Sequence, residues 1–492
     1  MPLSVRNTLT GEREPFEPQD PDSVLLYFCG LTVSDYAHLG HARAWVHVDV
    51  MHRWLEHLGY TVQHVENFTD VNEKIVARVG EDDLGSEESA VAEHFVGSVI
   101  EDMRGLNLLR ATVYPRVSEH VPEILDLIED LLAEDHAYVS KGSVYFDVTS
   151  FPEYGRLSGQ DLTGMEPQGP EEERAEKRHP QDFALWKAGP VDPAAIAEHR
   201  DEDPSALEPA GQTWEAPWGD GRPGWHIECS AMSMTHLDET IDIHVGGQDL
   251  VFPHHENEIA QSEAATGEQF ARYWLHVDLL ETEGEKMSSS LQNFFTVENA
   301  LAELGVNPVR MFLLSAQYRQ PQTYSERTIE EAIERWDRLE RAFDRAVDAA
   351  DSSSAYATVE DPGLRASIET QRAAFETAMN DDFNTREALS ALFEVANAVN
   401  EHVDTAHRYD YRGLRRALET FETLGGEVLG FAFGGQTEGS VRLAEALIEE
   451  LLAVRERERE AGNYESADEI RDRLEALGVE VQDTDEGPQF RL

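Results

Sequence analysis

Two short motifs in this chain combine residue types that bind phosphate. His38-Leu39-Gly40-His41 stands between an apolar run and a helix-like pattern, where a helix N-terminus would direct N–H groups and a positive dipole end at an anion. Lys286-Met287-Ser288-Ser289-Ser290 combines one of only five lysines with three hydroxyls, and no acid follows before Val297. Such a loop can hold a triphosphate and stabilise charge that develops at its α-phosphate. Taken alone, the first motif also fits a chance pair of histidines, and the second also fits a polar turn.

A third set of residues has the chemistry of a metal site. His254 and Glu258 are four residues apart and share one face of a helix. The only two thiols are Cys29 and Cys229, and two thiolates with an imidazole and a carboxylate form a good four-coordinate zinc set. An HExxH metalloprotease site at 255–259 is excluded, because Ile259 stands where the second histidine is required. The alternative is two buried, unligated cysteines and an exposed polar helix.

The elements that must position these residues follow an α/β pattern. A buried strand at 25–28, a helix from His38 to Gly59 and a strand at 61–65 form a βαβ unit, which favours a parallel sheet. Further expected elements are helices at 85–110 and 119–137, strands at 144–148 and 241–245, and a mainly helical chain from Thr328 onward. Linkers are expected near 351–363 and 434–439, and acidic surface loops at 165–180 and 191–212. The last 50 or so residues are expected to form a small unit with helices at about 441–460 and 464–477 and a strand at 479–481.

The charge of the chain is unusual. The 492 residues carry 97 acids against 40 bases, a formal net charge of −57, and only five of the bases are lysines. Self-repulsion of this size is screened in molar salt, so we expect a protein of a halophilic cytoplasm. Two cysteines exclude a disulfide framework, and no apolar run is long enough for a membrane span, so we expect a cytoplasmic protein with no membrane partner.

Several longer runs resemble one family, the cysteinyl-tRNA synthetases. They extend over nearly the whole chain, and the second and third below are long and specific. The runs are Cys29-Gly30-Leu31-Thr32-Val33 with His38 to His41, Gly224-Trp225-His226-Ile227-Glu228-Cys229-Ser230-Ala231-Met232, Phe252-Pro253-His254-His255-Glu256-Asn257-Glu258, Asn67-Phe68-Thr69-Asp70, Lys286 to Thr296, Met379 to Thr385, and Tyr464 to Leu477.

The resemblance implies a class I synthetase that activates L-cysteine with ATP and transfers it to the 3′-terminal adenosine of tRNA-Cys. It implies a Rossmann-type parallel-sheet core at 1–305 with an insertion at about 115–225, a stem-contact helical segment at 306–350, a helical anticodon-binding domain at 351–433 and a small C-terminal domain at 440–492. ATP, with Mg²⁺, would contact His38, Gly40, His41, Lys286, Met287, Ser288, Ser289 and Ser290, of which His38, His41, Lys286 and Ser288 would be catalytic. One Zn²⁺ would be held by Cys29, Cys229, His254 and Glu258, and cysteine would lie against Gly30, Thr69, Trp225 and Asp249.

Three departures from the family pattern stand out. Ser289 replaces the usual second lysine of the loop, so catalysis would depend more on Lys286. Leu31 and Ser34 replace the usual proline and tyrosine near the first cysteine.

Two other functions remain open from the sequence: a related ligase that joins cysteine to a small-molecule amine, and a non-catalytic zinc-stabilised RNA-binding module. The run at 379–385 and the final unit disfavour the first, and the two ATP motifs disfavour the second.

Two acid-poor windows are the expected tRNA contacts, because phosphate binding requires local cations. Residues 305–325 contain no acid but include Arg310 and Arg319. Arg408, Arg412, Arg415 and Arg416 lie in nine residues with one acid, Asp410. We expect the first window to touch the inner side of the tRNA and the second to lie near the anticodon arm. The alternative for the second window is pairing of its arginines with acids of neighbouring helices.

Overall fold

The computed structural model describes residues 2–81, 84–162, 164–165, 174–200, 202–282, 285–286, 295–353 and 359–434, together with 480–484, 487–491 and scattered positions between 448 and 474. Two compact units divide the chain, Met1–Phe431 and Ala432–Leu492. No helix in the described part of the chain is long and apolar enough to cross a membrane.

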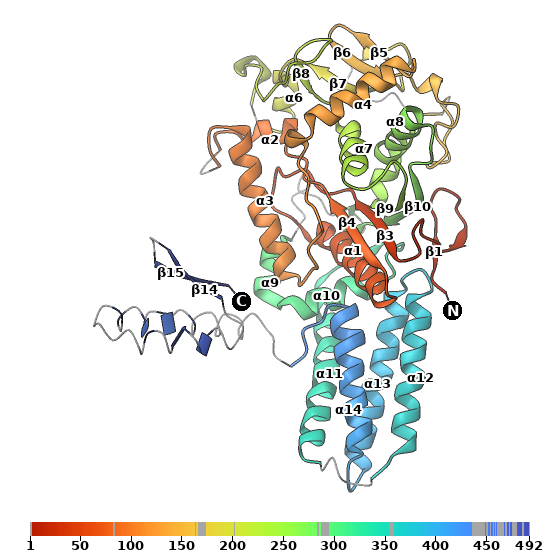
Figure 1. The fold of residues 1–492 in the computed structure, drawn as a ribbon, viewed down its shortest axis with the longest axis vertical. Helices are drawn as coiled ribbons and strands as arrows, with labels where there is room; N and C mark the ends of the chain where they lie inside the picture. Colours follow the sequence, from red (N-terminus) through yellow and green to blue (C-terminus); the bar gives the residue numbers. More distant parts are fainter. Residues whose placement is uncertain are drawn as a thin grey trace. The chain divides into compact units, whose positions relative to one another are not determined.

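A four-stranded parallel sheet lies at the centre of the first unit (Figure 1). Its strand order is β10-β9-β3-β4, with every neighbouring pair parallel. The strands are β3 (Ser23–Phe28), β4 (Thr61–Glu66), β9 (Ile241–Gly247) and β10 (Ala271–Val277). β9 and β10 are almost wholly buried, as expected for strands covered on both faces. The carboxyl ends of β3 and β9 lie side by side, where open α/β sheets bind ligands.

Helix α1 (Leu39–His57) connects the parallel strands β3 and β4 and completes the predicted βαβ unit. Helix α1 is held in place both by its apolar face and by buried charged groups. The Arg43 guanidinium donates to the carbonyls of Asp278 (3.0 Å) and Gln320 (2.6 Å), and Asp49 accepts from Arg310 of α10 (Val306–Leu314) at 2.7 Å. These bonds hold the N-terminus of α1 against the segment that follows β10.

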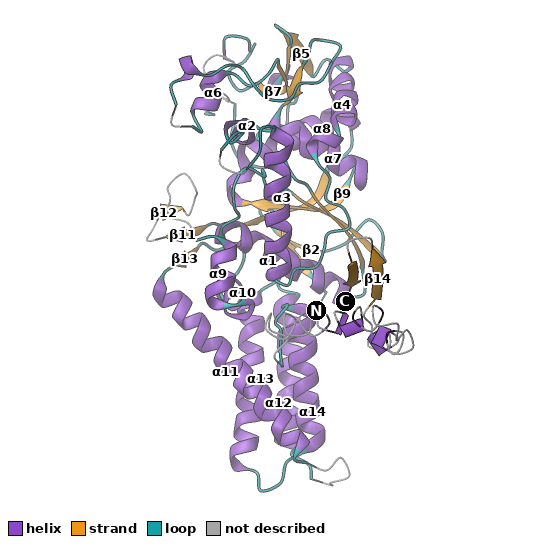
Figure 2. Cartoon of the chain, turned by 90° about the vertical axis from the view of Figure 1, so that its left-hand side faces the viewer, coloured by secondary structure: helices purple, strands orange, loops and turns teal. Residues whose placement is uncertain are grey.

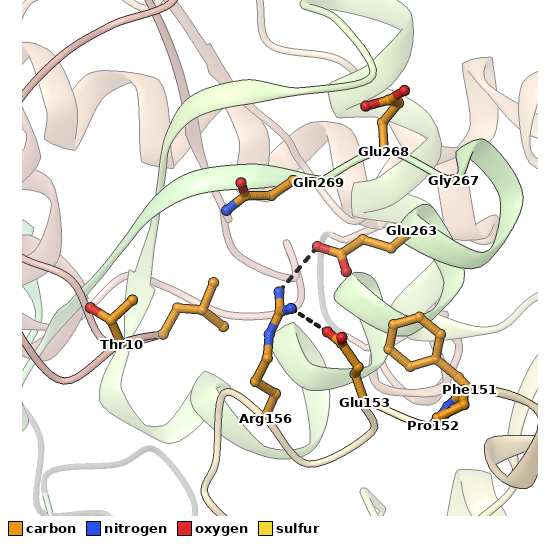
Figure 3. A pocket seen from close by; sticks show the side chains of 10 residues that line it. Thr10, Phe151, Pro152, Glu153, Arg156, Glu263, Gly267, Glu268 and Gln269 are labelled. Carbon is orange, nitrogen blue, oxygen red and sulfur yellow. Dashed lines mark hydrogen bonds and ion pairs between the residues drawn. The ribbon is translucent and has the colours of Figure 1, made fainter.

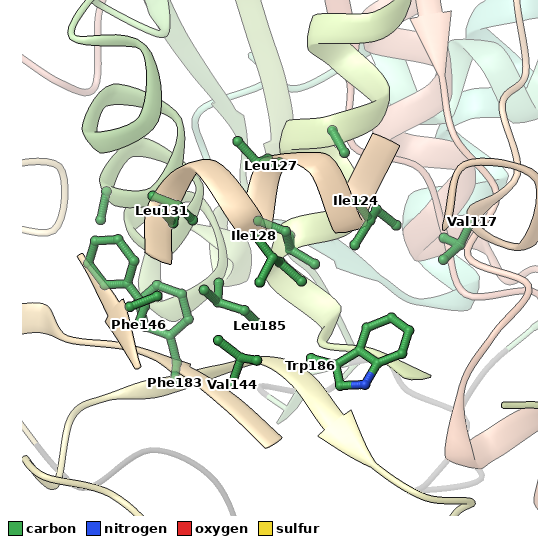
Figure 4. Packing of buried hydrophobic residues seen from close by; sticks show 14 of the residues in the cluster. Val117, Ile124, Leu127, Ile128, Leu131, Val144, Phe146, Phe183, Leu185 and Trp186 are labelled. Atoms are coloured by element: carbon green, nitrogen blue, oxygen red, sulfur yellow. The ribbon is translucent and has the colours of Figure 1, made fainter. Parts of the chain in front are cut away.

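The insertion between β4 and β9 forms its own antiparallel sheet, β5-β6-β7-β8. Figure 4 shows α4 (Val121–Ala133) packing on this sheet through Ile124, Leu127, Ile128 and Leu131, against Val144, Phe146, Phe183, Leu185 and Trp186. The spacing of these α4 residues is the i, i+3, i+4, i+7 pattern of one apolar helix face. The strands are β5 (Ala137–Ser140), β6 (Ser143–Phe146), β7 (Phe183–Ala188) and β8 (Gly221–Pro223).

A bundle of helices follows the parallel-sheet core, as Figure 2 shows from the side. The helices are α11 (Glu326–Asp351), α12 (Pro362–Met379), α13 (Thr385–Thr405), α14 (Tyr411–Thr420) and the π-helical η7 (Phe421–Val428). A capping box starts α11, in which Ser325 and Thr328 each bind the other's backbone N–H. Trp336, Leu339 and Phe343 of α11 are buried in the bundle, so an apolar stripe on an otherwise charged helix builds this core.

The remaining elements are short or connect these parts. They are β1 (Ser4–Arg6), β2 (Arg13–Pro15), α2 (Glu73–Ala77), α3 (Glu88–Gly105), η1 (Val117–Glu119), η2 (Val148–Ser150), α6 (Pro193–Ala197), η3 (Pro204–Ala206), α7 (Trp225–His236), η4 (Gln248–Leu250), η5 (Val251–His255), α8 (Glu256–Thr266), β11 (Leu280–Thr282), β12 (Glu285–Lys286), α9 (Val297–Leu304) and β13 (Gln322–Tyr324). In the second unit, β14 (Glu480–Thr484) pairs antiparallel with β15 (Gly487–Arg491).

The predicted fold class is confirmed: a parallel α/β core with an inserted subdomain precedes a helical bundle. The sequence prediction placed one strand at 479–481 and missed β15, whose Gly487 and Pro488 are poor strand formers. The predicted linker at 434–439 and the helices at 441–460 and 464–477 lie largely outside the described residues. The domain boundaries stay a prediction.

Candidate active site

A cavity of about 370 Å³ opens where the carboxyl ends of β3 and β9 meet the N-terminus of α1. The described lining brings together residues from three of the predicted sets: Cys29, Gly30, His38, Gly40, His41, Trp225 and Asp249. These residues span more than 200 positions of sequence. Their convergence on one concave site, at the ligand-binding edge of the sheet, is the arrangement expected of an active site.

The two histidines of the first motif form the N-terminus of α1. His38 is the N-cap residue, and its Nδ1 accepts a hydrogen bond from the Gly40 backbone N–H at 3.0 Å. The His38 N–H in turn donates to Nδ1 of His41 at 3.3 Å, and the rings stack with centroids 3.8 Å apart. A Cβ at Gly40 would lie 2.7 Å from the His38 ring, so glycine is required for this cap. The first turn contains no acid, which leaves the positive end of the helix dipole available to an anion.

Four metal-type donors meet in the buried interior beside this cavity. Cys29 follows β3, Cys229 lies on α7, His254 lies in η5 and Glu258 lies on α8, and one donor atom from each lies within 4.8 Å of all the others. The Cys29 Sγ atom is 3.5 Å from Sγ of Cys229 and 3.4 Å from Nε2 of His254. Nε2 of His254 is 3.1 Å from Oε1 of Glu258. Ligands at zinc distances in a tetrahedron stand about 3.3–3.8 Å apart, so this donor set fits one metal ion.

The electrostatics of this set also favour a cation. The hydrogen bond between Cys229 and Cys29, together with burial, raises the pKa of the Cys229 thiol well above its ordinary value. A Cys229 thiolate therefore requires a compensating positive charge. Burial lowers the pKa of His254, which keeps the imidazole neutral, as a metal ligand must be. The buried His244 Nε2 lies 2.9 Å from the second carboxylate oxygen of Glu258 and orients it. His226 Nδ1 lies 2.9 Å from Nδ1 of His254 and does the same for that ring.

The four predicted cysteine-binding residues do not all line the cavity. Trp225 is 40% exposed at the start of α7, and its ring lies over His254 with centroids 4.4 Å apart. Gly30 allows its strand end to approach β4, since a Cβ there would overlap the carbonyl of Asn67. Asp249 contributes to the wall. Thr69 is buried outside the described lining, and its hydroxyl donates to Glu228 at 3.1 Å.

Sequence reasoning did not single out every residue that lines this cavity, and Trp45 and Lys74 are two that it missed. Trp45 belongs to α1, and its indole N–H donates to the buried Glu66 at 2.8 Å. A tryptophan in a helix is most simply explained by core packing, so no signal in the sequence singled it out. Lys74 does carry a signal, namely that lysine occurs only five times in the chain.

The prediction that Arg310 contacts tRNA is wrong. Its side chain is fully buried, and its guanidinium binds Asp49 at 2.7 Å and the carbonyls of Leu106 (2.8 Å) and Leu429 (2.9 Å). The other arginines differ among themselves. Arg319 donates to the Arg6 carbonyl at 2.9 Å, while Arg416 pairs with Glu369 (2.6 Å) and Glu419 (2.8 Å). Arg412 and Arg415 are exposed on α14.

The predicted loop lies mostly outside the described residues. Lys286 forms the end of β12, which pairs with β11, whereas Met287, Ser288, Ser289 and Ser290 are not described.

A second hollow, of about 600 Å³, lies away from these motifs (Figure 3). There Arg156 reaches between Glu153 and Glu263, 3.4 Å from the latter, so its central charges are largely compensated within the chain. We therefore place the active site in the first cavity.

Comparison with known proteins identifies the family of the chain. Residues 15–334 match the family model of the class I (C) tRNA synthetase catalytic domain. Residues 374–434 match the DALR domain, and residues 444–491 match the cysteinyl-tRNA ligase anticodon-binding domain. The chain is 66% identical to the cysteine–tRNA ligase of Haloarcula marismortui over 495 residues, with both chains fully covered. It is 65% identical to that of Halobacterium salinarum over 489 residues and 43% identical to that of Thermococcus onnurineus over 490, with at least 98% of each chain covered.

Solved structures show the same fold at much lower sequence identity. Mycobacterium tuberculosis methionyl-tRNA synthetase bound to methionyl-adenylate has a TM-score of 0.59 at 15% identity, with 83% of this chain and 92% of that chain covered. Agrobacterium radiobacter leucyl-tRNA synthetase has a TM-score of 0.58 at 13% identity, with 84% and 85% covered. The family matches and the full-length relatives show that the chain belongs to the cysteine–tRNA ligases, the class I synthetases that attach cysteine to tRNA.

Proposed function

We propose that the cavity beside α1 is where this chain activates L-cysteine with ATP and passes it to tRNA-Cys in the cytoplasm. The observation that carries this proposal is the placement of a buried Cys₂-His-Glu donor set beside the cavity that His38, Gly40 and His41 line. A nucleotide site and a thiol-selective site would thus share one pocket. A small-molecule cysteine ligase is disfavoured, because relatives that are cysteine–tRNA ligases match over the whole length of the chain.

In the first step, the carboxylate of cysteine attacks the α-phosphorus of ATP, and pyrophosphate leaves. His38 and His41 can donate hydrogen bonds to the phosphate oxygens, and the dipole of α1 favours the charge that develops there. Lys286 and Ser288, with Met287, Ser289 and Ser290, would close on the triphosphate, and Mg²⁺ would accompany it. In the second step, a hydroxyl of the terminal ribose attacks the adenylate carbonyl and AMP leaves.

We assign the amino-acid pocket to the other end of the cavity. Asp249 would pair with the substrate ammonium, while Gly30 and Trp225 would contact its short side chain. Thr69 would act behind them, through its hydrogen bond to Glu228. Zinc held by Cys29, Cys229, His254 and Glu258 would bind the substrate thiolate in preference to a hydroxyl, which supplies a discrimination against serine that an apolar pocket cannot provide.

The exposed arginines of α14 are the proposed contacts to tRNA in the bundle. Arg412 and Arg415 project from the bundle surface, Arg416 is partly compensated by acids, and Arg319 is partly engaged by the N-terminal strand. The anticodon-binding role predicted for residues 351–433 stays a prediction. The family model described as an anticodon-binding domain matches residues 444–491 instead.

Cysteine-dependent ATP–pyrophosphate exchange without tRNA tests the proposed nucleotide site. His41→Ala should lower the rate of exchange by about 10²-fold, because it removes a donor to the reacting phosphate. His407→Ala, an exposed histidine in the bundle, is the matched control and should exchange like the unmodified chain. Equal rates for the two variants would contradict the assignment of His41.

A further inference from the structure

Lysine is the rarest charged residue of this chain, and Lys74 lies on the wall of the active-site cavity. It belongs to α2, whose start is fixed by the Asn72 side chain accepting from the Lys74 backbone N–H at 3.0 Å. Ile75, Val76 and Ala77 are buried behind it, so the orientation of the helix is fixed and Lys74 remains exposed. A fixed cation at the mouth of a cavity is suited to bind an anion.

Within the described part of the chain, no carboxylate forms an ion pair with Lys74, although acids outnumber bases 97 to 40. Its neighbour Glu73 faces Arg222 of β8 instead, at 3.9 Å. Burial acts to raise the pKa of Glu73, but the charges of Lys187 and Arg222 more than offset it and the pKa lies below its ordinary value. Lys187 and Arg222 therefore place positive charge close to Glu73, the residue that precedes Lys74.

Lys74 lines the same cavity as the proposed phosphate site but belongs to a different element. Arg222 and Lys187 belong to the inserted sheet, and α2 packs against α6 of the same insertion (Figure 1). The proposed phosphate site is instead at the N-terminus of α1, which belongs to the parallel core. Lys74 thus places a positive charge on the wall of this cavity, on an element other than α1.

We propose that Lys74 binds a backbone phosphate of the 3′-terminal strand of tRNA as that strand enters the cavity. This inference rests on the proposed function and adds a binding residue to it. A single-stranded terminus presents phosphates at short intervals, and a lysine on a fixed helix can hold one of them while the terminal ribose reaches the adenylate.

Lys74→Met, which keeps most of the side-chain length and removes the charge, tests this proposal in two assays. In aminoacylation, the KM for tRNA should rise about three- to tenfold, and the slope of log affinity against log KCl concentration should become shallower by about 0.7. In ATP–pyrophosphate exchange without tRNA, the change should stay below about twofold. Lys74→Arg should recover most of the affinity for tRNA, because it retains the charge.

Lys141→Met is the matched control, since Lys141 is an exposed lysine in the β5–β6 turn that pairs with Glu176 at 3.5 Å and does not line the cavity. It should leave both assays unchanged. An equal fall in exchange and charging for Lys74→Met would assign Lys74 to ATP and overturn the proposal, as would an unchanged KM for tRNA. Failure of the proposed function would appear differently, as absent exchange and charging in the unmodified chain, and would overturn this inference as well.

Discussion

At the scale of single residues, the molecule buries a compact set of polar donor groups beside its proposed active site. Cys29, Cys229, His254 and Glu258 are all buried, and their donor atoms face one another. Such a group is costly unless a cation compensates it. Its ligand types were readable in the sequence because the chain has only two cysteines. The supporting histidines, such as His244, were not, because a lone histidine has no spacing signal.

The proposed metal site gives the first test at this scale. The unmodified chain should retain about one zinc per molecule, and Glu258→Gln should reduce its zinc affinity about tenfold or more, because a neutral amide is a poor zinc ligand. Elemental analysis after gel filtration measures this. Glu263→Gln is the matched control on the same helix, since Glu263 pairs with Arg156 and not with the donor set. Equal zinc contents in both variants would contradict the ligand assignment.

Glu66 gives a second test, through pH. Burial raises the pKa of its carboxyl group from 4.5 to about 8, while in the unfolded chain it should return to its ordinary value. Between these two pH values the folded state binds more protons than the unfolded state, so the free energy of unfolding falls as pH rises, by up to about 3–5 kcal/mol. Glu66→Gln, which still accepts from Trp45, should lose this dependence. Denaturant unfolding of both proteins from pH 5 to pH 9 measures it, and parallel curves would contradict the assignment.

At the scale of elements, buried arginines connect helix α1 to the rest of the chain. Arg43 and Arg310 both lie fully inside, bonded to carbonyls and, for Arg310, to Asp49. The acid-poor window 305–325 suggested a nucleic-acid surface, and the structure shows a buried anchor at Arg310 instead. Composition along the chain cannot separate these two roles, because both require arginine without nearby acids. The strands and helices themselves were predictable from apolar periodicity, as in β3 and α1.

We therefore expect that replacing Arg310 lowers the stability of the protein rather than its affinity for tRNA. Arg310→Met should lower the free energy of unfolding by about 3–5 kcal/mol, because Asp49 would keep a buried charge without its main partner. Arg412→Met removes an exposed arginine and should change the free energy of unfolding by less than about 0.5 kcal/mol. Chemical unfolding in molar KCl compares the two. A stable Arg310→Met protein with a raised KM for tRNA would restore the role as a surface contact.

At the scale of the whole molecule, two properties act together. The formal net charge of −57 suits a chain that folds in concentrated salt, and relatives 66% and 65% identical to it come from Haloarcula and Halobacterium. Against that background the few lysines gain significance, because one of the five, Lys74, lines the cavity of the proposed site. The family could be recognised from long motifs, but the cavity that unites them depends on contacts across more than 200 residues, which spacing alone does not give.

The most direct test of the account is the attachment of amino acids to tRNA by the purified chain in molar KCl, with cysteine and serine in competition. We predict that cysteine is attached and serine is not, and that removal of zinc by a chelator abolishes attachment until zinc is restored. Attachment of serine alongside cysteine, or full activity after zinc removal, would contradict the proposed metal filter. Cysteine-dependent exchange without any attachment to tRNA would contradict the proposed reaction itself.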